Sequence, residues 1–150
     1  MKLLVKKIHP AAQLPAYATP GSACFDLHAV IEQDIHGEKP LIITPGNSAN
    51  IPIGLAVEIP AGHVMMIFSR SGHGFKNSVR LSNATGVIDS DYRGPLAVSL
   101  HNDGRARFHV RHGERIAQAL VLPIPTVSIE EVETLTDTAR GAGGFGSTGK

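Results

Sequence analysis

Two aspartates and a tyrosine, Asp89, Asp91 and Tyr92, lie close together in the polar stretch at residues 86–96. The valine and isoleucine before them favour an extended strand, and the Asp-Ser-Asp sequence favours a turn. A Gly-Pro pair then interrupts the backbone before the apolar run at residues 96–100. We therefore predict a β-hairpin whose turn presents side chains and backbone groups to a ligand. The alternative, favoured by the turn alone, is that each aspartate only hydrogen-bonds to its own backbone.

A cation, a hydroxyl and two glycines follow one another at residues 69–74, which read Ser-Arg-Ser-Gly-His-Gly. Glycine lets backbone N–H groups approach a phosphate closely, a serine such as Ser71 adds a donor, and Arg70 can bind two oxygens at once. The stretch predicts an anion-binding loop, and an ordinary surface loop explains it equally well.

The chain ends in a glycine-rich stretch, residues 140–150, that carries Arg140, Phe145 and Ser147. Such a terminus is ordinarily disordered. An arginine, an aromatic ring and a serine spaced by glycines would also suit a flap that becomes ordered over a nucleotide, with the arginine on phosphate and the ring on the base. Residues 144–150 formally match a phosphate-binding loop, but no Ser or Thr follows the lysine, and we reject that assignment.

Two polar residues interrupt otherwise apolar runs. Asp26 lies among small and apolar residues at positions 22–30, and Gln118 lies within the apolar run at residues 115–122. A half-buried aspartate must be paired or hydrogen-bonded, so one interpretation is that Asp26 is a structural residue with satisfied hydrogen bonds. The alternative is that Asp26 orients other groups of a functional site. Among the histidines, His109 and His112 form the closest pair, but no cysteine pair or His-Glu partner stands at ligand spacing, so we expect no metal bound by the protein alone.

The composition excludes several classes of function. The chain has 14 basic and 13 acidic residues, so its net charge favours neither nucleic acid nor anionic lipid as a partner, and any anion site must be local. The single cysteine, Cys24, cannot form a disulfide within the chain, which suits a reducing cytosol. No secretory segment or long apolar run is present, so we expect a cytoplasmic protein with no membrane partner.

The length of 150 residues predicts one domain, and 16 glycines and 10 prolines suit short strands and tight turns. No helix-period segment of useful length appears, and we predict an all-β sandwich or barrel with one helical turn at residues 75–79. Short turns after residues 96–100 suggest that the strands from there to residue 122 pair with one another. We expect strands at residues 1–8, 41–44, 49–59, 63–68, 87–88, 96–100, 106–110, 115–122 and 127–132.

Five stretches of this sequence together resemble the ordered motifs of the trimeric dUTP diphosphatases, or dUTPases. The resemblance covers the whole domain, and its third and fifth motifs are long and specific. The sequence departs from the pattern at Cys24, where glycine is usual, and at Ser69, where proline commonly stands; both positions lie beside the residues that the resemblance assigns to the site. The five motifs lie at residues 23–27, 70–72, 86–94, 113–118 and 140–149.

The resemblance implies a jelly-roll-like β-barrel that assembles as a homotrimer with shared active sites. Residues 1–135 would form the hydrolase domain, and residues 136–150 would form an arm that closes over an active site. The implied activity is hydrolysis of dUTP to dUMP and pyrophosphate with Mg²⁺ on the triphosphate, which limits uracil in DNA and supplies dUMP for thymidylate synthesis.

The resemblance also assigns roles to residues of this sequence. Asp89 would activate the water that attacks the α-phosphorus, and Tyr92 would pack on the deoxyribose and exclude a ribose 2′-hydroxyl. Asp26 would help to order water around the metal, which no protein side chain would bind directly. Uracil would be read by Asn83 and the backbone of Gly86, Val87 and Ile88 and stacked by Phe145, and the phosphates would be bound by Arg70, Ser71, Gly72, Gln118, Arg140, Gly146 and Ser147.

Two other functions remain open at this point. A dCTP deaminase resembles the same superfamily fold, but the complete Asp-x-Asp-Tyr turn and the Arg…Gly-Phe-Gly-Ser tail argue against it. A catalytically silent nucleotide-binding or regulatory trimer would share most of the ligand residues, and the behaviour of Asp89 decides between that trimer and an enzyme.

Overall fold

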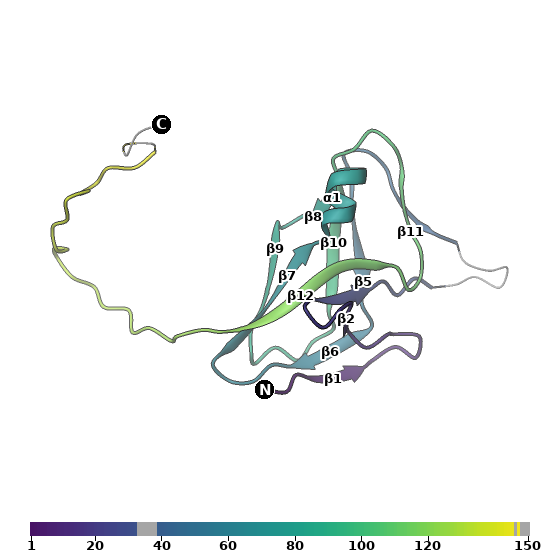
Figure 1. Cartoon of the computed structure of the whole chain (residues 1–150), viewed down its shortest axis with the longest axis horizontal. Helices are drawn as coiled ribbons and strands as arrows, with labels where there is room; N and C mark the ends of the chain where they lie inside the picture. The colour runs from purple at the N-terminus through teal and green to yellow at the C-terminus, as the bar shows by residue number, and fades with distance from the viewer. Residues whose placement is uncertain (33–38, 146, 148–150) are drawn as a thin grey trace.

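The computed structural model describes residues 1–32, 39–145 and 147. Strands form its body, one short helix lies at one end, and a long extended segment follows the last strand (Figure 1). The prediction of a mostly β fold is thus confirmed. The elements in chain order are β1 (Leu4–Lys7), β2 (Ala16–Tyr17), β3 (Phe25–His28), β4 (Leu41–Ile43), β5 (Ser48–Pro52), β6 (Leu55–Glu58), β7 (His63–Ser69), α1 (Ser71–Asn77), β8 (Val79–Leu81), β9 (Thr85–Ile88), β10 (Ala97–Asn102), β11 (Phe108–Val110) and β12 (Arg115–Pro123).

Antiparallel pairing joins these strands into sheets. The largest sheet has the order β2-β3-β12-β7-β9, and its central strand β12 pairs with β3 on one side and with β7 on the other. A second sheet has the order β5-β10-β8, and the pairs β1-β6 and β4-β11 are two-stranded. In the described parts of the chain, hydrogen bonds do not close these four sheets into a single barrel.

One hydrophobic core lies between the sheets, and every sheet contributes to it. Alternate side chains on a strand point to opposite faces, which is why β10 alternates between buried and more exposed residues. Each fully buried aliphatic side chain stabilises the fold by about 1.5–3 kcal/mol relative to an exposed one. Fully buried examples, one from each sheet, are Leu55, Ile43, Leu100 and Met65.

The single strand expected at residues 49–59 is wrong, because the chain turns at Gly54 between β5 and β6. The backbone of Gly54 has a φ of 70°. A Cβ atom there would lie 2.9 Å from side-chain carbons of both Ala12 and Val30, so only glycine fits this close approach. The turn lets β5 pair with β10 and β6 pair with β1. The apolar alternation continues across the turn and favours one strand, although Pro52 and Gly54 in its middle indicate a break.

The β-hairpin expected at residues 86–96 is also wrong. The strand before the turn, β9, pairs with β7, whereas the strand after it, β10, pairs with β5 and β8. The N–H of Leu96 donates to the carbonyl of Leu55 at 2.8 Å, and the carbonyl of Leu96 accepts from the N–H of Ile53 at 3.0 Å. These bonds draw the chain onto a different sheet, so residues 89–96 connect two sheets.

The prediction that the strands between residues 96 and 122 pair with one another fails for a related reason. β10 pairs with β5 and β8, β11 pairs with β4, and β12 pairs with β3 and β7. Short connections permit local pairing but do not require it. Each strand instead buries its apolar face against strands that are distant in the sequence.

The helical turn expected at residues 75–79 begins earlier, since α1 spans Ser71–Asn77. It ends at Ser78, which adopts a left-handed conformation with a φ of 56°. In the described parts of the chain, no helix is long and apolar enough to cross a membrane.

The strand expected at residues 127–132 does not form. Figure 1 shows the chain leaving the body after β12 and continuing as an extended segment. Val127 is 72% exposed and Ile129 is 93% exposed. A strand needs a neighbour to satisfy its backbone hydrogen bonds, and among the described residues no strand pairs with this segment.

Candidate active site

Asp26 joins two arginines at one end of the largest sheet. Asp26 lies on β3, and only 8% of the residue's surface is exposed. The Nε of Arg70, just after β7, donates to Oδ1 of Asp26 at 3.1 Å, and Nη1 of Arg115, at the start of β12, donates to Oδ2 at 3.0 Å. A buried carboxylate requires such partners. The cluster therefore fixes the ends of three neighbouring strands relative to one another.

Gln118 lies beside this cluster. On β12 it is in register with Asp26 on one side and with Phe68 on the other. Its Nε2 amide donates to the carbonyl of Ser69 at 3.0 Å. The structure thus brings together three residues that the sequence singled out separately, Asp26, Arg70 and Gln118.

The first turn of α1 places Ser71 and Gly72 next to Arg70. Both are exposed. Arg70 precedes the helix in an extended conformation, and its carbonyl accepts hydrogen bonds from the N–H groups of His73 and Gly74, both at 3.1 Å. A hydroxyl and backbone N–H groups therefore follow directly after the arginine in the chain, and these are donor types suited to phosphate oxygens.

A cavity of about 400 Å³ lies between β9 and β10. It exists because these two strands belong to different sheets. A volume of this size is within the range of about 300–1,000 Å³ that is typical of ligand pockets. Four of the predicted uracil-contacting residues line the cavity: Asn83, Gly86, Val87 and Ile88.

The turn that follows β9 carries Asp89 and Tyr92. Together with Ile88 and Leu96 they line a second hollow of about 310 Å³. The hydroxyl of Tyr92 donates to the carbonyl of Pro95 at 3.0 Å, and the N–H of Tyr92 donates to the carbonyl of Asp89 at 3.2 Å. The carboxylate of Asp89 is exposed, so it is accessible to water and to a ligand.

Gly94 is required for this arrangement. A Cβ atom at Gly94 would overlap the hydroxyl and ring of Tyr92. The glycine therefore lets the tyrosine ring fold back over the turn, where its hydroxyl reaches Pro95.

One chain does not bring Arg70 and Asp89 together. Phe68 pairs with Thr85, and Met65 pairs with Ile88, so Arg70 follows one end of the β7–β9 pair and Asp89 follows the other. The four residues of β9 lie between the two positions, about 13 Å or more along the strand. The guanidinium of Arg70 also points across β12 toward Asp26, away from β9.

The tail residues lie apart from these groups. The yellow C-terminal end of the chain is distant from the body in Figure 1. Phe145 is fully exposed, and Nε of Arg140 donates to the nearby carbonyl of Gly143 at 2.8 Å. Ser147 is described and exposed, whereas Gly146 lies outside the described residues. Within one chain, the tail residues that the structure describes therefore do not meet the arginine cluster or the turn at Asp89.

The Asp26 cluster perturbs two neighbouring groups. Burial lowers the pKa of His28, the carboxylate of Asp26 opposes that shift, and the guanidinium groups of Arg115 and Arg70 reinforce it. Burial raises the pKa of the Cys24 thiol, and Asp26 raises it further. The thiol of Cys24 therefore remains protonated near neutral pH and is unsuited to nucleophilic chemistry.

Sequence patterns alone assign no specific role to Arg115 or His73. The side chain of Arg115 pairs with Asp26, and its carbonyl accepts hydrogen bonds from Nη1 of Arg70 at 3.2 Å and from Nε2 of His73 at 2.9 Å. These residues are far apart in the sequence, and no local spacing indicates their contact. The one available signal was the position of Arg115 in the same short motif as Gln118.

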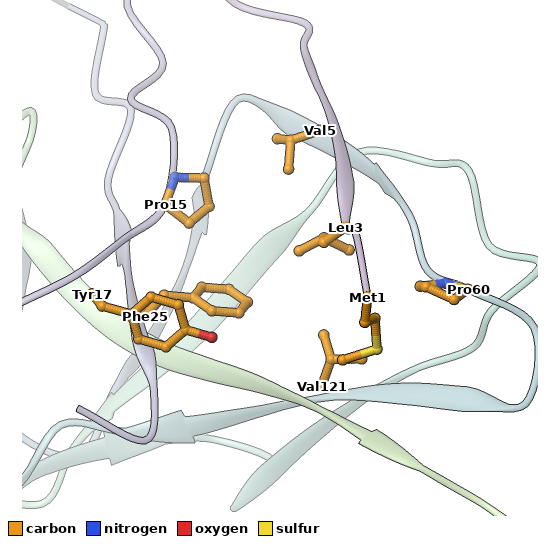
Figure 2. A pocket seen from close by; sticks show the side chains of 8 residues that line it. All are labelled: Met1, Leu3, Val5, Pro15, Tyr17, Phe25, Pro60 and Val121. Atoms are coloured by element: carbon orange, nitrogen blue, oxygen red, sulfur yellow. The ribbon is translucent and has the colours of Figure 1, made fainter. Parts of the chain in front are cut away.

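An apolar pocket of about 290 Å³ lies elsewhere and contains none of the predicted site residues. In Figure 2 the rings of Tyr17 and Phe25 lie on one side of it and Met1 and Val121 on another. Apart from Tyr17 with its hydroxyl, the side chains that line the pocket are apolar. It is a candidate for contact with another apolar surface rather than for catalysis.

The body is mostly β and carries an arginine cluster, an exposed carboxylate and a pocket between two sheets. Together these features suit a class of protein that binds a small polyanionic ligand such as a nucleotide. The comparisons with known proteins narrow this class. A family model described as dUTPase matches residues 11–149.

Curated relatives agree with the family model. A protein of Nautilia profundicola named deoxyuridine 5′-triphosphate nucleotidohydrolase is 47% identical over 150 residues, which are 100% of both chains. A protein of the same name from Xanthomonas campestris pv. campestris is 45% identical and is matched over 99% of this chain and 95% of its own length.

A solved structure agrees as well. The dUTPase of Staphylococcus bacteriophage 80alpha with dUPNHPP has a TM-score of 0.83 and 28% sequence identity over 99% of both chains. The chain belongs to the dUTPase family.

Proposed function

We propose that this protein hydrolyses dUTP to dUMP and pyrophosphate, an activity that limits uracil in DNA and supplies dUMP for thymidylate synthesis. Membership of the dUTPase family supports the substrate and the reaction. The observation that carries the proposal is the cavity lined by Asn83, Gly86 and Val87, which adjoins the hollow that holds the carboxylate of Asp89. A base bound in the first would place the rest of the nucleotide near the second.

Asp89 is the general base in this proposal. In-line attack on the α-phosphorus requires a positioned group that accepts a proton from water. The exposed carboxylate of Asp89 lies at the turn, and the backbone hydrogen bond from Tyr92 to its carbonyl holds that turn in shape. Asp91 shapes the same turn and has no catalytic role in the proposal.

Tyr92 acts on the sugar. Its hydroxyl is held by the carbonyl of Pro95, so the ring has a defined position in the hollow beside Asp89. A deoxyribose can pack against this ring, whereas a ribose would bring its 2′-hydroxyl against an apolar surface with no partner. Leaving that hydroxyl unpaired disfavours UTP.

Arg70, Ser71, Gly72 and Gln118 bind the phosphate chain in the proposal. The guanidinium supplies positive charge, and the hydroxyl and backbone groups at the start of α1 supply further donors. Arg140, Gly146 and Ser147 of the tail would add to them when the arm closes, and Phe145 would stack on uracil.

Mg²⁺ would be held mainly by the triphosphate and water. In the ranges 1–32 and 39–145, no three His, Cys, Asp or Glu side chains are grouped so as to hold a metal ion. Both oxygens of Asp26 accept hydrogen bonds from arginines, so its carboxylate is suited to ordering nearby water rather than to direct ligation. When bound, Mg²⁺ would neutralise charge on the phosphate oxygens.

The separation of Arg70 from Asp89 supports a site shared between subunits. Since both residues must act on one substrate, Arg70 of one subunit would meet Asp89 of another. A homotrimer of jelly-roll-like subunits supplies this arrangement three times by symmetry.

The extended C-terminal segment also favours an assembly. Val127, Ile129 and Leu135 are 72%, 93% and 86% exposed. Several exposed apolar residues within one short segment are typical of an interaction surface. In the proposal, the segment of one subunit lies on a neighbour, and residues 136–150 form the arm that closes over an active site, with residues 1–135 as the domain.

Product analysis tests the proposed reaction. The protein is incubated separately with dUTP and dCTP in the presence of Mg²⁺, and pyrophosphate and ammonia are measured. Pyrophosphate from dUTP without ammonia from dCTP is the expected result. Ammonia from dCTP would indicate a deaminase, and binding of dUTP without either product would indicate a silent nucleotide-binding trimer.

The variant Asp89→Asn separates binding from chemistry. It should bind a non-hydrolysable dUTP analogue with nearly wild-type affinity and hydrolyse dUTP about 100-fold or more slowly, since a general base typically contributes about 10²–10⁴-fold. Asp91→Asn is the matched control within the same turn. Near-normal turnover by Asp89→Asn would disprove the base assignment.

A further inference from the structure

His73 is the residue that attaches α1 to the body of the protein. Among the seven residues of α1, all of which are described, only His73 is not exposed, and its side chain is 12% exposed. Phe75, in contrast, is 92% exposed although it is the most apolar residue of the helix. A helix this short gains little stability from its own hydrogen bonds. Its position must therefore come from contacts such as those of His73.

The contacts of His73 lead directly to the arginine cluster. Its Nε2–H donates to the carbonyl of Arg115 at 2.9 Å; a carbonyl can only accept, so the ring is the donor. The same carbonyl accepts from Nη1 of Arg70 at 3.2 Å. The ring also packs edge-on against Phe108, with centroids 5.2 Å apart.

Arg70 ties the entry to the helix to the same carbonyl, but within the first turn itself His73 is the one residue that is not exposed. The residue before the helix makes no side-chain hydrogen bond to the free N–H groups of the first turn. Ser71 and Gly72 are exposed. The bond from His73 to Arg115 therefore fixes where these two residues lie relative to β12.

We propose that His73 is a positioning residue that holds Arg70, Ser71 and Gly72 in the orientation needed to bind the substrate's triphosphate. This inference rests on the proposed role of Arg70 and Ser71 in phosphate binding. Loss of the bond lets the first turn of α1 move away from β12. A displacement of this kind reduces catalysis strongly even when the displaced groups are intact.

The test compares three variants of the full chain, His73→Leu, His73→Gln and His73→Asn. The amide nitrogen of glutamine can occupy the position of Nε2 and donate to Arg115, whereas that of the shorter asparagine matches Nδ1 and does not reach. His73→Leu and His73→Asn should lower kcat/KM for dUTP by about tenfold, the effect of one lost hydrogen bond, and His73→Gln should recover most of it.

Calorimetric measurement of binding of the dUTP analogue dUpNHpp distinguishes failure of the His73 inference from failure of the proposed phosphate role of Arg70. Arg70→Ala should weaken that binding, and in the Arg70→Ala background His73→Leu should have a smaller effect than in the wild type, because one of the groups that the histidine positions is already absent. An undiminished effect of His73→Leu in that background would overturn the inference, as would wild-type kcat/KM in His73→Leu or equal losses in the leucine and glutamine variants. Unchanged binding by Arg70→Ala itself would instead refute the proposed phosphate role of Arg70.

Discussion

Arg70 and Asp89 follow opposite ends of the β7–β9 strand pair, and the guanidinium of Arg70 points away from β9 toward Asp26. In the proposed mechanism these two residues, as phosphate-binding arginine and water-activating carboxylate, nevertheless act on one substrate. The geometry of a single chain therefore supports catalysis at a boundary between subunits. The same geometry explains why the arginine cluster can be fully paired with Asp26 without involving the turn that carries Asp89.

Replacement of Asp26 by asparagine should destabilise the protein. The buried carboxylate accepts hydrogen bonds from two arginines, and its neutral analogue leaves both cations without an anionic partner. We expect the free energy of unfolding to fall by about 2 kcal/mol, measured by urea denaturation.

The control for this prediction is Asp103→Asn. Asp103 pairs with Arg80 at 2.7 Å, but both side chains are nearly half exposed, at 46% and 48%. An exposed pair contributes less than about 1 kcal/mol. Equal losses in the two variants would show that the Asp26 cluster contributes no more than a surface ion pair.

Replacement of Tyr92 by alanine should weaken the rejection of UTP. The ring that packs against the sugar is then absent, and a 2′-hydroxyl can be hydrated. The ratio of kcat/KM for UTP to that for dUTP should rise by about tenfold or more. Tyr92→Phe keeps the ring and loses only the hydrogen bond to Pro95, so its ratio should change much less. An unchanged ratio in the alanine variant would remove the proposed sugar contact.

Deletion of residues 140–150 should abolish most turnover while leaving a folded oligomer. The deletion removes Arg140 and Phe145, which the proposal places on phosphate and on uracil. We expect kcat/KM to fall by about 100-fold. Phe145→Ala should reproduce much of this loss, and Phe75→Ala is the matched control because Phe75 is another exposed phenylalanine, at 92%. Full activity of the truncated protein would refute the closing arm.

The stability of the protein should decrease in mild acid because of His28. Burial lowers its pKa from 6.5, with Asp26 opposing and Arg115 and Arg70 reinforcing the shift. The unfolded chain therefore binds more protons than the folded one below about pH 6.5, and stability falls as the pH decreases toward the lowered pKa. Wild type should lose more unfolding free energy between about pH 7 and pH 5 than His28→Gln, as measured by urea denaturation at each pH. Equal losses of unfolding free energy in the wild type and in His28→Gln would show that His28 is not responsible for the acid sensitivity.

The mostly β fold could be predicted from the sequence because alternating apolar residues indicate strands and frequent Gly and Pro indicate the turns between them. The pairing of strands could not. β9 and β10 flank a short turn that is typical of a hairpin, yet Leu96 bonds to Ile53 and Leu55, which lie far away in the sequence. Such long-range partners are selected by burial of whole strand faces, a property that no local stretch reveals.

For the candidate site, too, some features could be predicted from the sequence and others could not. Motif residues such as Asp26, Arg70 and Gln118 could be found from their types, because a charge or amide within an apolar run requires an explanation. The contact of His73 with the carbonyl of Arg115 could not be found, since a backbone acceptor has no signature in the sequence. The positions of Arg70 and Asp89 at opposite ends of the β7–β9 strand pair likewise emerged only with the strand register.

Mixing two inactive variants tests the shared site most directly. Arg70→Ala and Asp89→Asn, each of which should be strongly impaired alone, are unfolded together and refolded as mixed trimers whose composition is checked by native mass spectrometry. If Arg70 and Asp89 of different subunits form each site, random mixing restores about a quarter of wild-type dUTP hydrolysis, since one pairing in four joins an intact Arg70 to an intact Asp89. Mixed trimers that remain as inactive as the separate variants would contradict the account.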